Sequence, residues 1–130
     1  MIGWNLLDDK FFFAPEFMAR GSLADLLDSE PSKLDWGDAG KKLLSDAVRG
    51  LCYLHSMRPK AVVHHDVKPA NILISEEYVA KLTDFGLSKK LNRTNTVQLR
   101  GTLCYCAPEI LNNGKGNDRS DIYSFGVVMV

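Results

Sequence analysis

The longest amphipathic pattern in the chain lies between residues 38 and 57. Apolar residues recur there at every third or fourth position, and charged residues fall on the other side. This spacing predicts a helix over Asp38–Met57 with Lys41, Lys42 and Arg49 in solvent. The helix also carries His55, which we expect to be a packing or capping residue rather than a catalyst. The apolar stripe expected to face the core comprises Leu43, Leu44, Ala47, Val48, Leu51, Cys52 and Leu54.

Two β-type segments precede this helix. Ile2–Trp4 and Phe11–Phe17 are predicted to be strands joined by a turn at residues 8–9, where two aspartates interrupt the apolar pattern. Pro15 cannot donate to a strand ladder, so the second strand is expected to lie at an edge or to end there. A short helix over Leu23–Leu27 is predicted next, capped by the preceding serine.

A polar loop between two apolar runs carries the densest set of chemically active side chains. The runs Val62–Val63 and Ile72–Ile74 are β-type, and the residues between them include Asp66, Lys68 and Asn71. A loop held between buried strands can fix an acid, a cation and an amide for catalysis or binding. Taken alone, the aspartate could also be a turn-forming residue.

Two further motifs follow this loop in a characteristic order. An Asp-Phe-Gly motif begins at Asp84, 18 residues after Asp66 (84 − 66), and an Ala-Pro-Glu motif begins at Ala107. With the loop sequence H-x-D-x-K-x-x-N, these motifs resemble the catalytic loop and activation segment of protein kinases. The order and spacing of the three motifs make a coincidence very improbable.

The resemblance covers essentially the whole chain and implies a fold. That fold is α+β and protein-kinase-like, truncated, with a mostly helical large lobe and short β-hairpins. Residues 1–130 would form one partial kinase domain. Within it, residues 1–18 would supply the last strands of the small lobe and the hinge, and residues 19–130 part of the large lobe.

The resemblance also implies ATP-dependent phosphoryl transfer and a role for each polar loop residue. Asp66 would accept the proton of the substrate hydroxyl, and Lys68 would approach the γ-phosphate. Asn71 would assist catalysis and, with Asp84, hold Mg²⁺, because a hard cation prefers oxygen ligands and keeps several waters. Gly86 would let the backbone of Asp84 move.

Further positions are implied to bind the ATP cofactor. These are Glu16, Met18 and Leu73, together with the metal-binding Asp84. The stretch 16–18 resembles the kinase hinge, although the residues alone favour a plain linker between strand and helix. Pro15 stands where the family places its gatekeeper side chain, which leaves the shape of the adenine pocket open.

Other details of the resemblance concern the acceptor and the support of the loop. Lys68 two residues after the catalytic aspartate is typical of serine/threonine kinases, and Thr102 is expected near both residues. Asp121 would anchor the backbone of the catalytic loop through its carboxylate. With the Gly21-Ser22-Leu23 stretch, the chain looks most like the tyrosine-kinase-like group of serine/threonine kinases.

One position departs from the family pattern. The arginine that usually precedes the catalytic aspartate is His65 here, and a histidine cannot bind a phosphate in the bidentate manner of arginine. An unperturbed histidine is also largely uncharged at neutral pH. Phosphorylation of Thr94 or Thr96 in the activation segment is therefore expected to activate the protein weakly or not at all.

Composition and charge restrict the partners and the compartment. The 16 basic and 16 acidic residues balance to a formal charge of zero, so neither nucleic acid nor an anionic membrane is an expected partner. The expected partner is a protein substrate. Three cysteines without zinc-type spacing indicate reduced thiols, Cys52 being expected to be buried. No apolar run is long enough to span a membrane, and a cytoplasmic, intracellular location is expected.

Two functions from different classes remain open. The first is an enzyme, a serine/threonine kinase. The second is a truncated, catalytically inactive module that acts by binding a partner or a nucleotide, because the sequence contains neither a glycine-rich loop on a strand nor a Val-Ala-Ile-Lys motif. In that case the apolar side chains of Val127, Val128 and Val130 are expected to be uncovered.

Overall fold

The computed structural model describes residues 3–8, 10–29, 37–84, 103–113 and 116–130. Some of the predicted features lie outside these ranges, namely those at Gly86, Thr94, Thr96 and Thr102.

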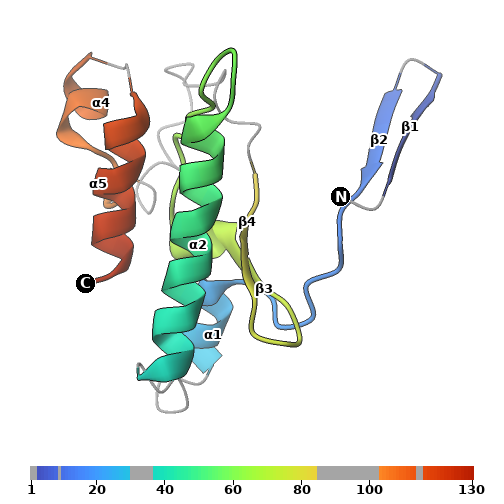
Figure 1. The fold of residues 1–130 in the computed structure, drawn as a ribbon, viewed down its shortest axis with the longest axis horizontal. Coiled ribbons are helices and arrows are strands. Elements are labelled where there is room, and N and C mark those ends of the chain that lie inside the picture. Colours follow the sequence, from blue (N-terminus) through green and yellow to red (C-terminus); the bar gives the residue numbers. More distant parts are fainter. Residues whose placement is uncertain (1–2, 9, 30–36, 85–102, 114–115) are drawn as a thin grey trace.

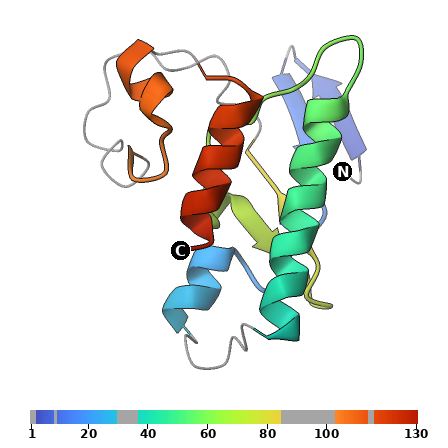
Figure 2. The ribbon, with the colours of Figure 1, turned by 60° about the vertical axis from the view of Figure 1, so that its left-hand side comes forward.

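The main body is built around one long helix, α2 (Asp38–Ser56). Figures 1 and 2 show α5 (Asp118–Val128) beside it, running in the opposite direction, with α4 (Pro108–Asn113) near the start of α5. The short helix α1 (Leu23–Ser29) lies near the N-terminal end of α2. The predicted long helix is thus confirmed to within one residue, and α1 is two residues longer than predicted.

A small hairpin connects the helices to the polar loop. Strands β3 (Ile72–Ile74) and β4 (Ala80–Leu82) pair antiparallel, with Ile72 opposite Leu82. Helix α2 packs on β4, while α1 packs on β3 and on a short 3₁₀ turn, η1 (Pro69–Asn71). The end of the polar loop, η1, therefore packs against α1 and leads directly into the hairpin.

A second hairpin lies at the N-terminus. Strands β1 (Gly3–Leu7) and β2 (Lys10–Ala14) pair antiparallel, with Leu7 opposite Lys10. Figure 1 shows this hairpin standing away from the helices, joined to them by an extended segment. Two antiparallel hairpins with a helical body confirm the α+β class.

The strand boundaries differ from those predicted. β2 ends directly before Pro15, so the expected strand end at this proline is confirmed, whereas the predicted segment from Pro15 to Phe17 is not a strand. β1 continues to Leu7 because pairing with β2 orders the residues up to the turn. Val62–Val63 is not a strand; the Val62 amide instead donates to the Leu54 carbonyl at 3.0 Å, at the end of α2.

One face of α2 supplies the centre of the core, but the predicted stripe was too wide. Leu43, Ala47 and Leu51 are at most 1% exposed, whereas Val48 is 37% exposed and the thiol-bearing Cys52 is exposed. Val48 and Cys52 each follow a buried residue by one position, which turns them about 100° around the helix. The prediction that Cys52 is a buried thiol was therefore wrong. The core cluster comprises Leu23, Leu26, Leu43, Ala47, Leu51, Val67, Ile72, Ile74, Ala80, Phe125 and Val128.

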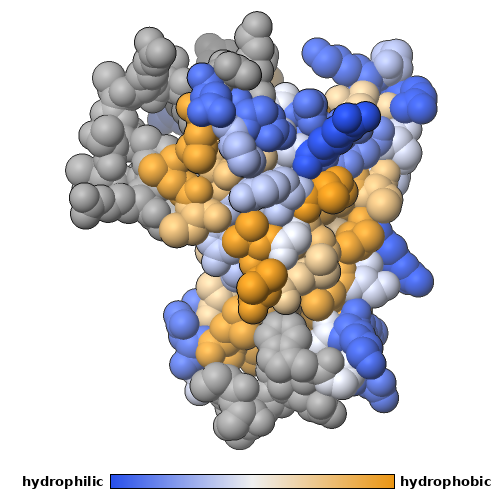
Figure 3. Space-filling view, turned by 90° about the vertical axis from the view of Figure 1, so that its left-hand side faces the viewer, coloured by the Kyte–Doolittle hydropathy of each residue, from blue (hydrophilic) through white to orange (hydrophobic). Residues whose placement is uncertain are grey.

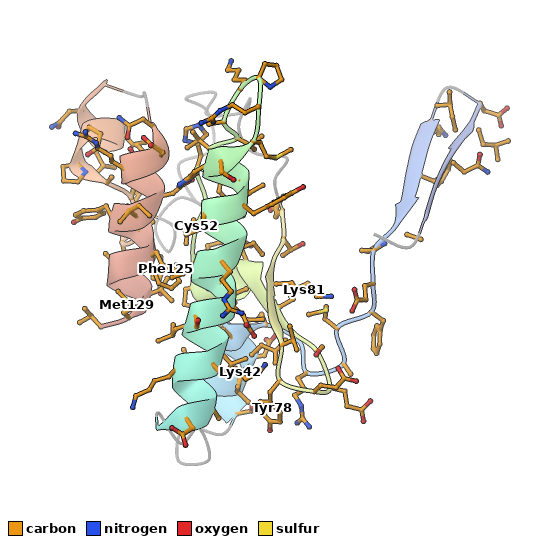
Figure 4. The ribbon with its side chains drawn as sticks, viewed as in Figure 1. Lys42, Cys52, Tyr78, Lys81, Phe125 and Met129 are labelled. Atoms are coloured by element: carbon orange, nitrogen blue, oxygen red, sulfur yellow. The ribbon has the colours of Figure 1, made fainter. Side chains whose placement is uncertain are left out.

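Helix α5 completes this core from the other side. Phe125 lies on the side of α5 that faces α2, and Met129 lies at its C-terminal end (Figure 4). Val130 is exposed as expected, but Val128 packs into the core, so its predicted exposure was wrong. Apolar side chains are visible on the surface over α5 in Figure 3. None of the described helices combines the length and the apolar character that crossing a bilayer requires.

Candidate active site

The polar loop is held in place by one carboxylate of α5. The backbone amides of His64 and His65 donate to Oδ2 and Oδ1 of Asp121, each at 2.8 Å. Asp121 is only 1% exposed, so these charge-assisted bonds form away from water. The expectation that Asp121 anchors the loop backbone is confirmed.

The same carboxylate also joins the loop to α2. The Nε2 atom of His55 lies 2.8 Å from Oδ2 of Asp121, which gives this oxygen a second partner. Burying a carboxylate is costly unless donors surround it, and His55 supplies the third contact. The prediction that His55 packs rather than catalyses agrees with this position, although its partner could not be predicted from the sequence.

His64 connects the loop to the segment after β4. It is fully buried, and its Nδ1 accepts from the Asp66 amide at 3.3 Å, while Nε2 lies 2.9 Å from the carbonyl oxygen of Thr83. Because Nδ1 accepts, Nε2 must carry the proton and donate to Thr83. This support role was missed in the sequence, where the first residue of the H-x-D motif was its only signal.

Two of the three predicted catalytic residues contact the third. Lys68 Nζ lies 2.7 Å from Oδ2 of Asp66, and the Asn71 amide nitrogen donates to the same oxygen at 2.8 Å. Asn71 also donates to the backbone carbonyl of Asp66 at 2.8 Å. The aspartate is therefore held by both its side chain and its backbone.

The other oxygen of this aspartate has no hydrogen-bond partner among the described residues. Oδ1 of Asp66 is buried and has no hydrogen-bond partner among the residues that the structure describes. A buried acceptor without a partner is costly and usually has a functional reason. With Oδ2 held by a cation and an amide, Oδ1 is the atom able to accept a hydroxyl proton.

The β3–β4 hairpin brings Asp84 to the end of the loop. Asn71 directly precedes β3, and the Thr83 amide donates to the Asn71 carbonyl at 3.0 Å, extending the ladder by one pair. Asp84 follows Thr83 and is exposed, with a positive φ of 63°. The catalytic loop and the start of the Asp-Phe-Gly motif are thus brought together at the end of the hairpin formed by Asn71 and Thr83.

The donor types at this position fit a magnesium ion. The Asn71 side-chain nitrogen donates to two oxygens of Asp66. The side-chain carbonyl oxygen of Asn71 is therefore the atom on the other side of the amide. That carbonyl and the Asp84 carboxylate are hard oxygen donors of the kind that Mg²⁺ prefers. Within the described part of the chain, no group of three or more His, Cys, Asp or Glu side chains could hold a metal by itself. Any ion held here would therefore share its coordination with waters and phosphate.

The predicted hinge lies along the face of the β3–β4 hairpin that carries Leu73 and Lys81. Glu16 pairs with Lys81 on β4 at 2.6 Å, and Lys81 stands opposite Leu73 in the ladder (Figure 4). Directly opposite residues share a face of the sheet, so Glu16 and Leu73 are brought to the same side. Met18 contributes its carbonyl, which accepts from Gly21 at 3.1 Å.

Further contacts fasten the hinge to the body. The Arg20 amide donates to the Ile74 carbonyl at 3.1 Å, and its guanidinium lies 4.0 Å from the centre of the Tyr78 ring. Lys42 of α2 donates to the Tyr78 carbonyl at 2.6 Å (Figure 4). These contacts from α2, the hairpin and the hinge explain the fixed position of the segment after β2.

The Ala-Pro-Glu segment adds negative charge beside the loop. The Ser120 hydroxyl donates to Glu109 at 2.6 Å, and this bond lowers the pKa of the Glu109 carboxyl. Burial raises the pKa of the Cys106 thiol, and the charges of Glu109 and Asp66 raise it further. Sequence analysis did not identify Ser120, 11 positions away, as the partner of Glu109.

The comparisons with known proteins agree with this geometry. The chain matches the protein kinase domain family over residues 1–130. It is 42% identical to the probable serine/threonine-protein kinase PBL25 of Arabidopsis thaliana, covering 100% of this chain and 36% of that protein. It is 36% identical to the lectin-domain containing receptor kinase VI.3 of the same plant, covering 98% of this chain and 20% of that protein.

A relative from a different organism also matches nearly the whole chain. The probable serine/threonine-protein kinase drkB of Dictyostelium discoideum is 34% identical over 98% of this chain and 18% of its own length. The chain thus spans between 18% and 36% of the length of these three relatives. With the family match over its full length, the chain belongs to the protein kinase domain family.

Proposed function

We propose that residues 1–130 provide catalytic residues of a protein serine/threonine kinase, which transfers the γ-phosphoryl group of ATP to serine or threonine of a protein substrate. The observation that carries this proposal is the hydrogen bonding of the two carboxylate oxygens of Asp66. Its Oδ2 is held by Lys68 and Asn71, while its buried Oδ1 has no partner among the described residues.

The proposed roles follow from the positions of the side chains. Asp66 accepts the proton of the acceptor hydroxyl, which general-base catalysis makes worth roughly 10²–10⁴-fold in rate. Lys68 lies beside it and offers a cation to the transferred phosphoryl group. Asn71 and Asp84 would hold Mg²⁺, which offsets phosphate charge when it is bound.

The nucleotide is proposed to lie against the outer face of the β3–β4 hairpin. Leu73 is half-buried there, and Glu16 is tied to the same face through Lys81. Met18 lies between Glu16 and the residues that pair with β3, so its backbone follows the hairpin edge. This arrangement supports binding of the adenine by the stretch 16–18 and Leu73.

Two observations favour serine or threonine as the acceptor. Lys68 is in contact with the catalytic aspartate, as in the serine/threonine pattern of the family. Two of the relatives described above carry serine/threonine-protein kinase in their names.

The decisive test compares Asp66→Asn with Asp8→Asn in the whole protein that carries residues 1–130. Asp66→Asn should lower kcat for serine peptides by roughly 10²–10⁴-fold. Asp8 lies exposed at the β1–β2 turn, with a φ of 48° that asparagine also adopts, so its variant should keep normal turnover. Equal turnover of the two variants would refute the role of Asp66.

A nucleotide titration tests the proposed metal ligands separately. Binding of ATP to the 130-residue chain is measured with and without Mg²⁺, for the natural sequence and for Asp84→Asn. The natural chain should bind more tightly with Mg²⁺, and the variant should lose that difference. Binding that ignores the metal in both proteins would contradict the assignment of Asp84.

A second candidate is a non-catalytic module that binds a partner. It is favoured by exposed apolar side chains on and after α5, since Ile122 and Met129 are 54% and 56% exposed (Figure 3). The two candidate functions predict different results in the nucleotide titration and in the measurement of phosphoryl transfer. Absence of both nucleotide binding and phosphoryl transfer in the whole protein would leave the partner-binding module as the better account.

A further inference from the structure

The segment that joins the N-terminal hairpin to the body, residues 15–17, makes few contacts. All three residues are exposed, Phe17 by 85%, so burial of apolar surface does not hold them in place. No backbone hydrogen bond joins residues 15–17 to another described residue. Regular backbone pairing resumes only beyond them, where the Met18 carbonyl accepts from the Gly21 amide at 3.1 Å. A contact of another kind must therefore hold this segment.

One ion pair supplies that contact. Lys81 Nζ lies 2.6 Å from Oε2 of Glu16, and Figure 4 shows Lys81 extending from β4 toward the segment. The two side chains are 47% and 48% exposed, so water screens the pair only in part. Among the described residues, neither side chain takes part in another ion pair or hydrogen bond. The pair is thus the side-chain contact that fastens residues 15–17 to the hairpin.

Lys81 belongs to a well-packed part of the structure. Strand β4 packs on α2, and the neighbouring Ala80 is only 4% exposed. Leu73 stands opposite Lys81 on β3, and Asp84 follows Lys81 by three positions (84 − 81). A side chain that starts from a packed strand holds its partner more precisely than one on a loop does. Lys81 therefore fixes Glu16 relative to both Leu73 and the strand that leads to Asp84.

We infer that Lys81 is a positioning residue for the nucleotide, which acts through Glu16 and holds the stretch 16–18 beside Leu73 before ATP binds; this rests on the proposed kinase function. Lys81 does not contact the nucleotide itself. Without the ion pair, the stretch would become ordered only on binding, and the lost conformational freedom would weaken the affinity for ATP. The rate of the chemical step depends on Asp66 and should not change.

The first experiment measures kcat and the KM for ATP with the whole protein and a serine peptide. Lys81→Met removes the charge but keeps a long, flexible side chain. It should raise the KM for ATP by roughly 1.5-fold to fivefold, as expected for a partly exposed ion pair, and leave kcat unchanged. Lys41→Met is the matched control, since Lys41 is exposed on α2 and has no ion-pair partner among the described residues. An equal KM in Lys81→Met and Lys41→Met would overturn the inference.

A charge swap tests whether the two side chains act together. Glu16→Lys and Lys81→Glu each place like charges against one another, so each should raise the KM for ATP more than Lys81→Met does. The double variant carries the same pair in reversed order and should recover most of the natural KM. Because both side chains are about half exposed, all variants should fold, which urea unfolding checks. A double variant no better than the single ones would show that the pair is not the cause.

Binding of adenosine separates this inference from the proposed function. Adenosine carries no phosphate, so Lys81→Met should raise its Kd by the same factor as that of ATP. A loss of affinity confined to ATP would mean that Lys81 attracts the phosphates directly, and would overturn the inference. Phosphoryl transfer with an adenosine affinity that does not depend on Lys81 would refute the inference alone. Adenosine binding that depends on Lys81, in a protein without turnover, would support the inference and refute the kinase activity.

Discussion

Replacement of Asp121 by asparagine tests the contact on which the catalytic loop depends. The carboxylate accepts from the amides of His64 and His65 and from His55, in each case at 2.8 Å. Two of these three contacts use Oδ2, and only that of His65 uses Oδ1. The asparagine should therefore place its carbonyl at the Oδ2 position and its NH₂ group against the His65 amide.

The expected magnitude follows from this choice. One charge-assisted bond is lost, worth about 1.5–3 kcal/mol, and the two remaining bonds weaken because the acceptor is now neutral. We expect Asp121→Asn to lower the free energy of unfolding by about 3 kcal/mol, within the range measured for broken buried pairs. Asp121→Ala removes all three contacts and should lower the free energy of unfolding by more than Asp121→Asn does. A typical domain is stabilised by only ~5–15 kcal/mol, so this loss would be a large part of the total.

Urea unfolding of the whole protein provides the measurement, with turnover of a serine peptide as the second readout. Asp118→Asn is the matched control, since this exposed residue lies in the first turn of the same helix. Losing a first-turn charge there should cost only about 0.5 kcal/mol. If Asp121→Asn and Asp118→Asn unfold at the same urea concentration with equal turnover, Asp121 does not support the loop.

Three further predictions concern the caps and the activation segment. Ser22→Ala removes the hydroxyl that caps α1 and should lower the free energy of unfolding by about 1 kcal/mol in urea; an unchanged midpoint would contradict the cap. The lowered pKa of Glu109 means that its ionised form stabilises the fold above the ordinary pKa of a glutamate, and that this contribution is lost as the pH falls through the lowered pKa. Ser120→Ala should raise this pKa toward its ordinary range in an NMR titration of the Glu109 carboxyl, and an unmoved titration would exclude the hydroxyl as the cause. Replacing Thr94 and Thr96 together by alanine should leave turnover unchanged, because the family's phosphate-binding arginine is absent from the catalytic loop; a collapse of activity would show that phosphorylation matters.

Local patterns in the sequence predicted helices α1 and α2, the turn between β1 and β2, and the active loop. The 3.6-residue period predicted α2, Pro15 ended β2, and Ser22 capped α1, because each of these effects acts within a few residues of the chain. Asp66, Lys68 and Asn71 were also found from the sequence, since they lie within one short loop. Their mutual contacts need little chain to be brought together.

Contacts between distant segments depend on tertiary packing. His55 and Asp121 are 66 positions apart, and Glu16 and Lys81 are 65 apart, so no local pattern could reveal these contacts. The contact of Asp121 with the loop amides was expected from the family resemblance, not from a local pattern. The exposure of Cys52 likewise depends on how far the neighbouring elements reach around α2, not on its own helical pattern. Residue types and their spacing can be read from the sequence. Burial and side-chain pairing depend on the packing of segments that are far apart along the chain.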